Sequence, residues 1–140
     1  MLDRPTLSEL IEAAREHIEI GVIPAVKGDG KLYFQTLVAL NVLKIAEREI
    51  ALRPAHQRAA WARLNALLGG ESPPPADHDA WEPAIAVRSA DLTRAIRDGA
   101  YDAPQARRAL FDHLRATAVE ALEIANPKLL DSLKTEPPGQ

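Results

Sequence analysis

Cysteine is absent from this sequence of 140 residues, and only 4% of its side chains are aromatic. The lack of cysteine excludes disulfide bonds, thiolate metal sites and a cysteine nucleophile, and it fits a reducing environment. Because aromatic rings are scarce, aliphatic side chains must fill the core, which favours packed helices. No apolar run approaches the roughly 20 residues of a membrane span, and the opening MLDRPTLSEL lacks the apolar segment of a secretory signal. These absences predict a cytoplasmic protein.

The overall composition is that of a globular protein, with 46% hydrophobic and 26% charged residues. A chain of this length buries about two thirds of its unfolded surface as one domain, so no metal or disulfide is needed to hold it. We predict a single helical domain over residues 1–133, with a proline-rich internal loop at 69–83 and a disordered tail at 134–140. The formal net charge of -3 argues against nucleic-acid binding over the whole surface, because phosphate neutralisation supplies most of that affinity.

The first predicted helix begins with a capping box. Thr6 is placed to accept a hydrogen bond from the amide of Glu9, while the Glu9 carboxylate reaches back to the amide of Thr6. Apolar residues then recur on one face with a period of about 3.6 residues, and charged residues occupy the other face. Pro24 removes an amide and clashes with the preceding turn, so we expect the regular helix to end or kink near residues 21–23. The stretch KGDGK, residues 27–31, predicts a turn between helices.

The second predicted helix, residues 31–52, is the most hydrophobic part of the chain. One flank carries Phe34, Val38, Val42 and Ile45, and the adjoining flank is also apolar. Apolar positions thus cover more than half of the helix circumference, which predicts a central helix with neighbours on several sides. Since this coverage exceeds what one core of this size needs, a second subunit is expected to bury part of it.

The rest of the sequence also reads as helical. Pro54 suits the first position of a third helix, and Gly69 and Gly70 suit its end. Gly99 is expected to cap the end of the fourth helix. No stretch has the apolar and polar alternation of a strand, so the predicted fold is all-α, an antiparallel bundle of about five helices with a short C-terminal helix. The later helices are expected over about 54–68, 83–98 and 102–125, with the short one after Pro127.

Three polar side chains of the second helix are the candidates for a ligand-binding site: Asn41, Arg48 and Glu49. Asn41 borders the apolar flank, where an amide either makes a hydrogen bond that fixes the register of two helices or contacts a ligand. Glu49 lies within the apolar arc and either forms an i,i+4 ion pair with Arg53 or acts as a functional carboxylate. The structural interpretation is favoured for both, because a buried polar group needs a partner and not a substrate.

The remaining polar residues do not form a catalytic pattern. None of the four histidines has the HxxxH or HExxH spacing of a zinc site on one helix. His113, Thr117 and Glu120 form a polar column along the fifth helix, which we interpret as solvated surface. No serine lies in a GxSxG turn. We therefore predict no catalytic residue, no metal site and no cofactor.

Two basic patterns are also interpreted as structural. Residues 51–70 contain Arg53, Arg58 and Arg63 but no acidic residue. Such a bias is typical of a solvated helix face, although it also suits an acidic partner or a nucleic acid. KGDGK places glycines before a helix, as phosphate-binding loops do, but it follows a helix instead of a strand and lacks the GxxxxGK[ST] spacing.

Three stretches of the sequence together resemble a family of short bacterial proteins known only as a domain of unknown function: RPTLSELIEAAREHI, LNVLKIAEREIAL and HLRATAVEALEIANPKLL. The resemblance spans about residues 4–130. Members of that family are often encoded beside a phosphotransferase that is similar to aminoglycoside kinases and beside an acyl-CoA dehydrogenase. The resemblance implies a helper for such an enzyme pair acting on hydroxyacyl-CoA substrates, and it assigns no catalytic residue to this chain.

The sequence as a whole predicts a non-enzymatic helical interaction or accessory protein. It is expected to form homo-oligomers and to have a phosphotransferase or acyl-CoA dehydrogenase as a possible partner. The alternative is a small-molecule-binding protein or enzyme with a pocket between helices, lined by Asn41, Arg48 and Glu49. Neither a membrane nor a nucleic acid is an expected partner.

Overall fold

The computed structural model describes residues 3–135, and every regular element in it is helical. No strand occurs within that range, which confirms the all-α fold class. None of its helices combines the length and the apolar character that crossing a lipid bilayer requires. In chain order the elements are α1 (Leu7–Glu16), the π-helical turn η1 (His17–Val22), α2 (Ile23–Val26), α3 (Gly30–Leu68), the 3-10 turn η2 (His78–Ala80), α4 (Trp81–Arg97), α5 (Pro104–Ala125) and α6 (Pro127–Thr135).

The chain divides into two compact units, Met1–Arg53 (unit 1) and Pro54–Gln140 (unit 2). The boundary falls inside α3, so this helix contributes its first part to unit 1 and its second part to unit 2. The domain predicted over 1–133 thus contains two units. Of the predicted tail, Lys134 and Thr135 belong to α6, and the rest lies outside the described residues.

α3 is one continuous helix of 39 residues, so the prediction of two helices divided before Pro54 is wrong. Without an amide hydrogen, Pro54 donates no hydrogen bond to the preceding turn, which costs roughly 3 kcal/mol in a helix interior. The residues around it are good helix formers, and no glycine or turn-forming residue accompanies the proline. The helix therefore continues through Pro54, which lies at the boundary between the two units.

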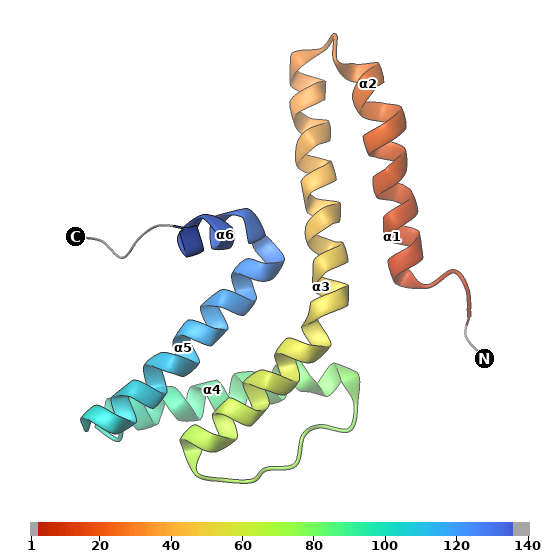
Figure 1. Ribbon diagram of the computed structural model, residues 1–140. Coiled ribbons are helices and arrows are strands. Elements are labelled where there is room, and N and C mark those ends of the chain that lie inside the picture. The colour runs from red at the N-terminus through yellow and green to blue at the C-terminus, as the bar shows by residue number, and fades with distance from the viewer. Residues whose placement is uncertain (1–2, 136–140) are drawn as a thin grey trace. The chain divides into compact units, whose positions relative to one another are not determined.

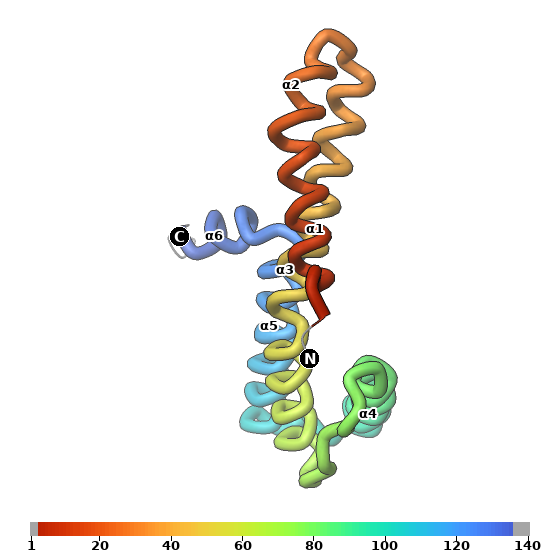
Figure 2. Tube along the Cα trace, turned by 90° about the vertical axis from the view of Figure 1, so that its right-hand side faces the viewer, coloured from red at the N-terminus to blue at the C-terminus, as the bar shows by residue number. Residues whose placement is uncertain are grey.

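Unit 1 is a helical hairpin. α1, η1 and α2 lie beside the first part of α3 and run in the opposite direction (Figure 1 and Figure 2). The predicted capping box is confirmed, because Thr6 Oγ1 accepts from the Glu9 amide at 3.2 Å and Glu9 Oε2 accepts from the Thr6 amide at 2.7 Å. Asp29 lies in the turn between the two arms, where its Oδ1 accepts from the Leu32 amide at 3.0 Å. KGDGK is thus the helix-to-helix turn that the sequence predicts.

The first arm of the hairpin departs from regular α-helix just before Pro24, as the sequence predicts, but the arm does not end there. It continues through Pro24 by way of the π-helical turn η1. In a π turn an amide bonds to the carbonyl five residues back, as the Ile23 amide does to the carbonyl of Ile18. Pro24 then lies in the first turn of α2, where a missing amide leaves no helical hydrogen bond unmade. The wider turn therefore absorbs the proline without ending the arm.

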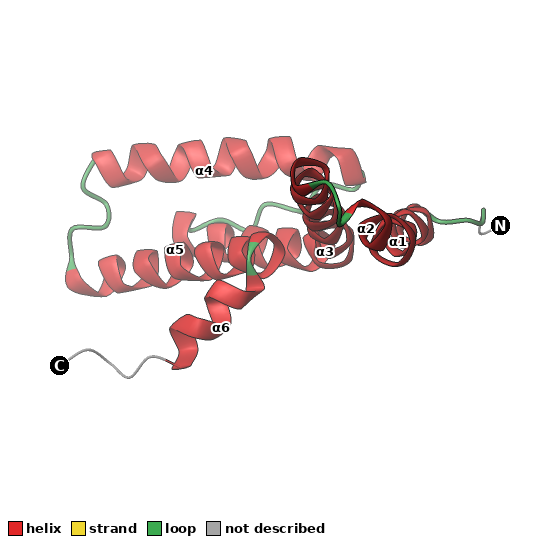
Figure 3. Cartoon of the chain, turned by 90° about the horizontal axis from the view of Figure 1, so that it is seen from above, coloured by secondary structure: helices red, strands yellow, loops and turns green. Residues whose placement is uncertain are grey.

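Unit 2 contains the second part of α3 together with α4, α5 and α6. α4 and α5 run in opposite directions (Figure 3), and both pack with α3 around a small aliphatic core. The Tyr101 hydroxyl donates to the carbonyl of Leu67 at 2.8 Å, so the one polar atom of this core side chain is satisfied. Gly99 follows the end of α4 with a φ of 83°, which confirms it as the predicted cap. The buried members of the core are Leu64, Leu92, Tyr101 and Leu110.

The proline-rich loop is fixed to α3 by hydrogen bonds. Trp61 Nε1 and Asn65 Nδ2 both donate to the carbonyl oxygen of Ser72, each at 3.0 Å. The Trp61 ring also meets the edge of Trp81 at 6.1 Å between centroids, and the Arg88 guanidinium lies 5.7 Å from the centroid of the Trp61 ring. These contacts tie the loop and the start of α4 to one side of α3. α4 begins at Trp81, two residues before the predicted end of the loop.

Candidate functional site

A row of apolar side chains on the first part of α3 is open to solvent. Phe34 is 66% exposed, Val38 is 49% exposed and Val42 is 57% exposed, while Ile45 is half-buried. At about 100° per residue, these four positions fall within an arc of about 80°. We refer to Phe34, Val38, Val42 and Ile45 as the outer face of α3.

The opposite side of α3 packs against the first arm of the hairpin. Leu40 is buried there, on the side of the helix away from the outer face. Lys44 Nζ donates to Glu19 Oε1 at 3.1 Å, and Arg15 Nε donates to Glu47 Oε1 at 2.8 Å. The hydrogen bond from Lys44 is the main cause that lowers the pKa of Glu19. These charged groups therefore join the two arms, and the polar arc of α3 faces its neighbour.

Within unit 1, the first part of α3 has one helical neighbour, the first arm (Figure 1), instead of the neighbours on several sides that the sequence predicts. A two-helix hairpin has a single seam, and the ion pairs of α3 with the first arm form at that seam. The apolar flank that the sequence predicts to be buried is instead the exposed outer face. An exposed row of large apolar side chains on a globular protein is a common sign of an interaction surface.

The three predicted ligand-binding residues all lie on the first part of α3. Asn41 is exposed, and its amide makes no hydrogen bond with the rest of the described chain, so the predicted register-fixing bond is not formed within this chain. Glu49 Oε1 lies 3.2 Å from Arg53 Nε, which confirms the predicted i,i+4 pair. Arg48 is half-buried. Ligand binding by Asn41, Arg48 and Glu49 stays a prediction.

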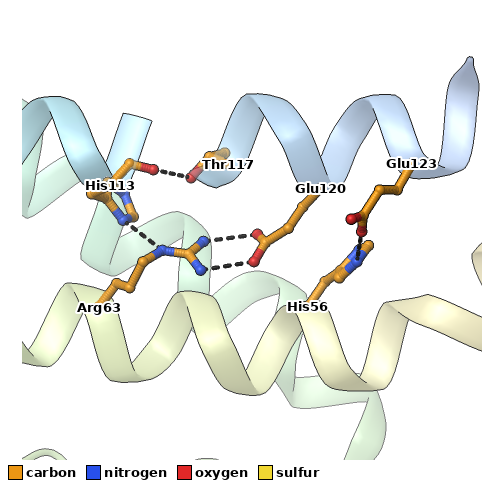
Figure 4. A network of polar contacts seen from close by, with 6 residues as sticks. All are labelled: His56, Arg63, His113, Thr117, Glu120 and Glu123. Carbon is orange, nitrogen blue, oxygen red and sulfur yellow. Dashed lines mark hydrogen bonds and ion pairs between the residues drawn. The ribbon is translucent and has the colours of Figure 1, made fainter. Parts of the chain in front are cut away.

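In unit 2, two side chains of α5 hold Arg63 of α3 (Figure 4). The two terminal nitrogens of Arg63 donate to the two carboxylate oxygens of Glu120, each at 2.7 Å, and Arg63 Nε donates to His113 Nδ1 at 3.2 Å. The side chains of Arg63 and Glu120 are 23% and 19% exposed, and His113 is buried. A second contact between the two helices joins His56 Nε2 to Glu123 Oε2 at 2.8 Å. A bidentate, partly buried arginine–carboxylate pair is among the stronger polar contacts in proteins.

His113 is arranged as a neutral imidazole. Because its Nδ1 accepts from Arg63, the ring proton is placed on Nε2. Burial, and then the positive charge of Arg63, lower the pKa of His113, while the carboxylate of Glu120 acts in the opposite direction. Thr117 Oγ1 donates to the His113 carbonyl at 3.0 Å and so makes no contact with the ring itself. The cluster of Arg63, Glu120 and neutral His113 therefore links α3 to α5 with no net charge.

A cavity of about 290 Å³ lies next to this cluster. Its volume is just below the range of about 300–1,000 Å³ that is typical of small-molecule sites. His113 Nε2 makes no hydrogen bond with another residue of the described chain, so it is a donor that a bound molecule could use. The cavity is lined by Arg63, Ala66, Leu67, Ala109, Asp112 and His113.

The interpretation of the polar column on α5 as solvated surface is wrong for two of its three members. His113 and Glu120 are turned toward α3, and Thr117 is exposed. The basic face predicted for 51–70 is correspondingly smaller, because Arg63 is bound to a carboxylate. The only hint in the sequence is that His113 and Glu120 are one heptad apart at the border of the apolar stripe of α5. Their arginine partner is some fifty residues away in the chain, so no local pattern connects them.

Among residues 3–135, no group of three or more histidine, aspartate or glutamate side chains is placed to hold a metal ion. The cluster of Arg63, His113 and Glu120 uses its polar atoms mainly on one another. Fold and sites together define an all-α protein with an exposed apolar helix face in unit 1 and an internal polar link with a small cavity in unit 2.

Comparison with known proteins places the chain in a family. Residues 24–129 match the family model described as Domain of unknown function (DUF6285). The match covers more than half of the chain, so the chain belongs to this family, and the resemblance to a domain-of-unknown-function family is confirmed to that extent. No curated protein and no solved structure matches the chain.

Proposed function

We propose that this chain is a cytoplasmic, non-enzymatic helical interaction protein that associates with itself through the outer face of α3. The observation that carries the proposal is the exposure of Phe34, Val38 and Val42 on one face of a helix whose other face is already packed. Leaving three large apolar side chains in water is unfavourable, so a surface that covers them gains free energy.

The strength of this association follows from the size of the outer face. Burying each half-exposed apolar side chain contributes about 1 kcal/mol, and two copies bury twice the number of side chains. Association costs at least about 4 kcal/mol in lost translational and rotational freedom. Four side chains from each copy thus leave a balance of about 4 kcal/mol, which is a weak dimer with a Kd on the order of 1 mM.

Sedimentation analysis of the purified chain at concentrations around this Kd tests the proposal. Val38→Asp places a charge in the outer face and should leave a monomer at every concentration. Val87→Asp is the matched control, since Val87 is a similarly exposed valine, 61% exposed, on α4. Val87→Asp should dimerise like the unmodified chain. A strictly monomeric unmodified chain, or equal dimerisation of both variants, would refute self-association through this face.

A heterologous partner follows from the family resemblance. The resemblance noted from the sequence implies an association with a phosphotransferase similar to aminoglycoside kinases and with an acyl-CoA dehydrogenase, so we propose that the chain assists one of these enzymes. Titration calorimetry of the chain with each purified enzyme tests this step. Saturable binding to one enzyme, weakened by Val38→Asp and not by Val87→Asp, is the expected result. If neither enzyme gives a heat of binding, the proposed partnership is refuted.

A second candidate function is small-molecule binding, and the cavity beside His113 is the observation that favours it. The cavity is not lined by Asn41, Arg48 or Glu49, so it offers a different site from the one predicted from sequence. Thermal-shift screening with small neutral and anionic compounds tests this candidate. Ala66→Phe fills the cavity, so it should abolish any stabilisation that a compound gives to the unmodified chain. Equal stabilisation of both proteins would place binding elsewhere.

A further inference from the structure

We propose that the dimer is an antiparallel, two-fold pairing of α3 in which Lys31 of each copy meets Glu49 of the other. This inference rests on the self-association proposed above and adds its partner, a second copy of this chain, and its geometry. It is drawn from the placement of two opposite charges at the two ends of the outer face.

Lys31 and Glu49 lie on the same line along α3 as the outer face. They are separated by about five helical turns, so both point in nearly the same direction and lie roughly 27 Å apart. On the helical wheel each is within about 20° of Val38. The apolar row therefore begins beside a lysine and ends beside a glutamate.

This layout is self-complementary in only one orientation. When two copies pair antiparallel about an axis midway between Val38 and Val42, Val38 of one copy packs against Val42 of the other. Phe34 then packs against Ile45 of the second copy, and Lys31 lies beside its Glu49. A parallel pairing would place lysine beside lysine and glutamate beside glutamate, and like charges in contact oppose association. Charge complementarity therefore selects the antiparallel orientation.

Both charged groups are accessible to a second copy. Lys31 is exposed and forms no ion pair with the rest of the described chain. Glu49 pairs with Arg53, but its side chain is 39% exposed, so one face of the carboxylate is open to another cation. A two-fold axis produces the Lys31–Glu49 contact twice, so a substitution at either residue changes two contacts in the dimer.

Charge reversal tests the orientation. Lys31→Glu or Glu49→Lys should each weaken the homodimer about tenfold, because two attractive contacts become repulsive. In an equimolar mixture of the two variants, both contacts are attractive again, so a heterodimer should form with nearly the affinity of the unmodified chain. The double variant Lys31→Glu/Glu49→Lys should likewise restore the homodimer. Single variants that dimerise normally, or a mixture that does not recover affinity, would overturn the antiparallel pairing.

The absence of cysteine permits a second measurement that does not depend on charge. Lys31→Cys and Glu49→Cys chains, mixed and treated with a short bis-maleimide cross-linker, should give the 31-to-49 product. Each variant alone should give little covalent dimer, because identical positions lie far apart in an antiparallel pair. Covalent dimers of either variant alone would show a parallel pairing.

If the unmodified chain is monomeric, the proposed self-association itself fails. If Val38→Asp abolishes the dimer while the charge and cross-linking results contradict the pairing, only the geometry fails.

Discussion

Replacing Arg63 by leucine should destabilise unit 2 by about 2–3 kcal/mol. The change leaves the Glu120 carboxylate, whose side chain is 19% exposed, without the two donors that now bind it at 2.7 Å. An unpaired charge that is largely removed from water carries a desolvation penalty that its partner normally offsets. The estimate is below the 3–5 kcal/mol of fully buried pairs because water still reaches both groups. Glu120→Leu should cost a similar amount, since it leaves the guanidinium without its carboxylate.

The double variant Arg63→Leu/Glu120→Leu shows whether the loss of stability comes from a charge left without its partner or from lost packing. It removes both charges, so it should cost less than the sum of the single variants, with a coupling free energy of about 1.5–3 kcal/mol. Urea unfolding followed by tryptophan fluorescence is a suitable assay, because both tryptophans, Trp61 and Trp81, lie in unit 2. The fluorescence change therefore reports on the unit that contains the pair.

A matched control is available on the same helix. Arg58 is an exposed arginine of α3, so Arg58→Leu should change the stability by no more than about 0.5 kcal/mol. If the effects of Arg63→Leu and Glu120→Leu simply add, or if Arg58→Leu costs as much as Arg63→Leu, the reasoning from the paired, half-buried charges is refuted.

Three further changes have defined outcomes. Thr6→Ala removes the capping hydroxyl of α1 and should lower stability by about 1 kcal/mol in urea unfolding followed by circular dichroism, and no change would refute the cap. Gly99→Ala puts a side chain at a φ of 83° and places its Cβ 2.9 Å from Asp102 Oδ2. The free energy of unfolding should therefore fall by about 1–2 kcal/mol, and the melting temperature should fall with it. An unchanged melting temperature would contradict this. The pKa of His113 is lowered from 6.5, so the unfolded chain takes up its proton first. Stability is therefore complete above about pH 6.5 and falls as the pH drops through the folded pKa. His113→Asn should flatten that fall in urea unfolding, whereas an unchanged slope would assign it to another group.

The features of this fold that were predicted correctly depend on short stretches of chain. The capping box needs only Thr6 and Glu9, which are three residues apart. Gly99 ends α4 because a residue with a positive φ follows the helix, and glycine adopts that conformation at little cost. The pair of Glu49 with Arg53 is likewise one helical turn long. Each of these follows from local hydrogen bonding or backbone conformation, which the sequence states directly.

The predictions that were wrong depend on what the rest of the chain supplies. Pro54 was predicted to separate two helices, yet α3 continues through it. A proline costs a few kcal/mol, and whether a helix ends there depends on what the flanking residues gain by continuing. The polar pair of His113 and Glu120 read as surface because its partner Arg63 lies on another helix.

The sequence by itself determined that the chain is helical, where most of its helices begin and end, and which family it belongs to, because periodicity, caps and local motifs are encoded over a few residues. Only the tertiary structure decided which face of each helix is covered. The apolar positions around α3 outnumber those that one neighbour covers, so periodicity identified its apolar flank but not that Phe34, Val38 and Val42 stay exposed. In the hairpin, the side of α3 that carries Leu40 and Lys44 faces the first arm, and the ion pairs of Arg15 and Lys44 form there. Contacts between distant residues fix orientation, and a one-dimensional pattern carries no information about which distant residues meet.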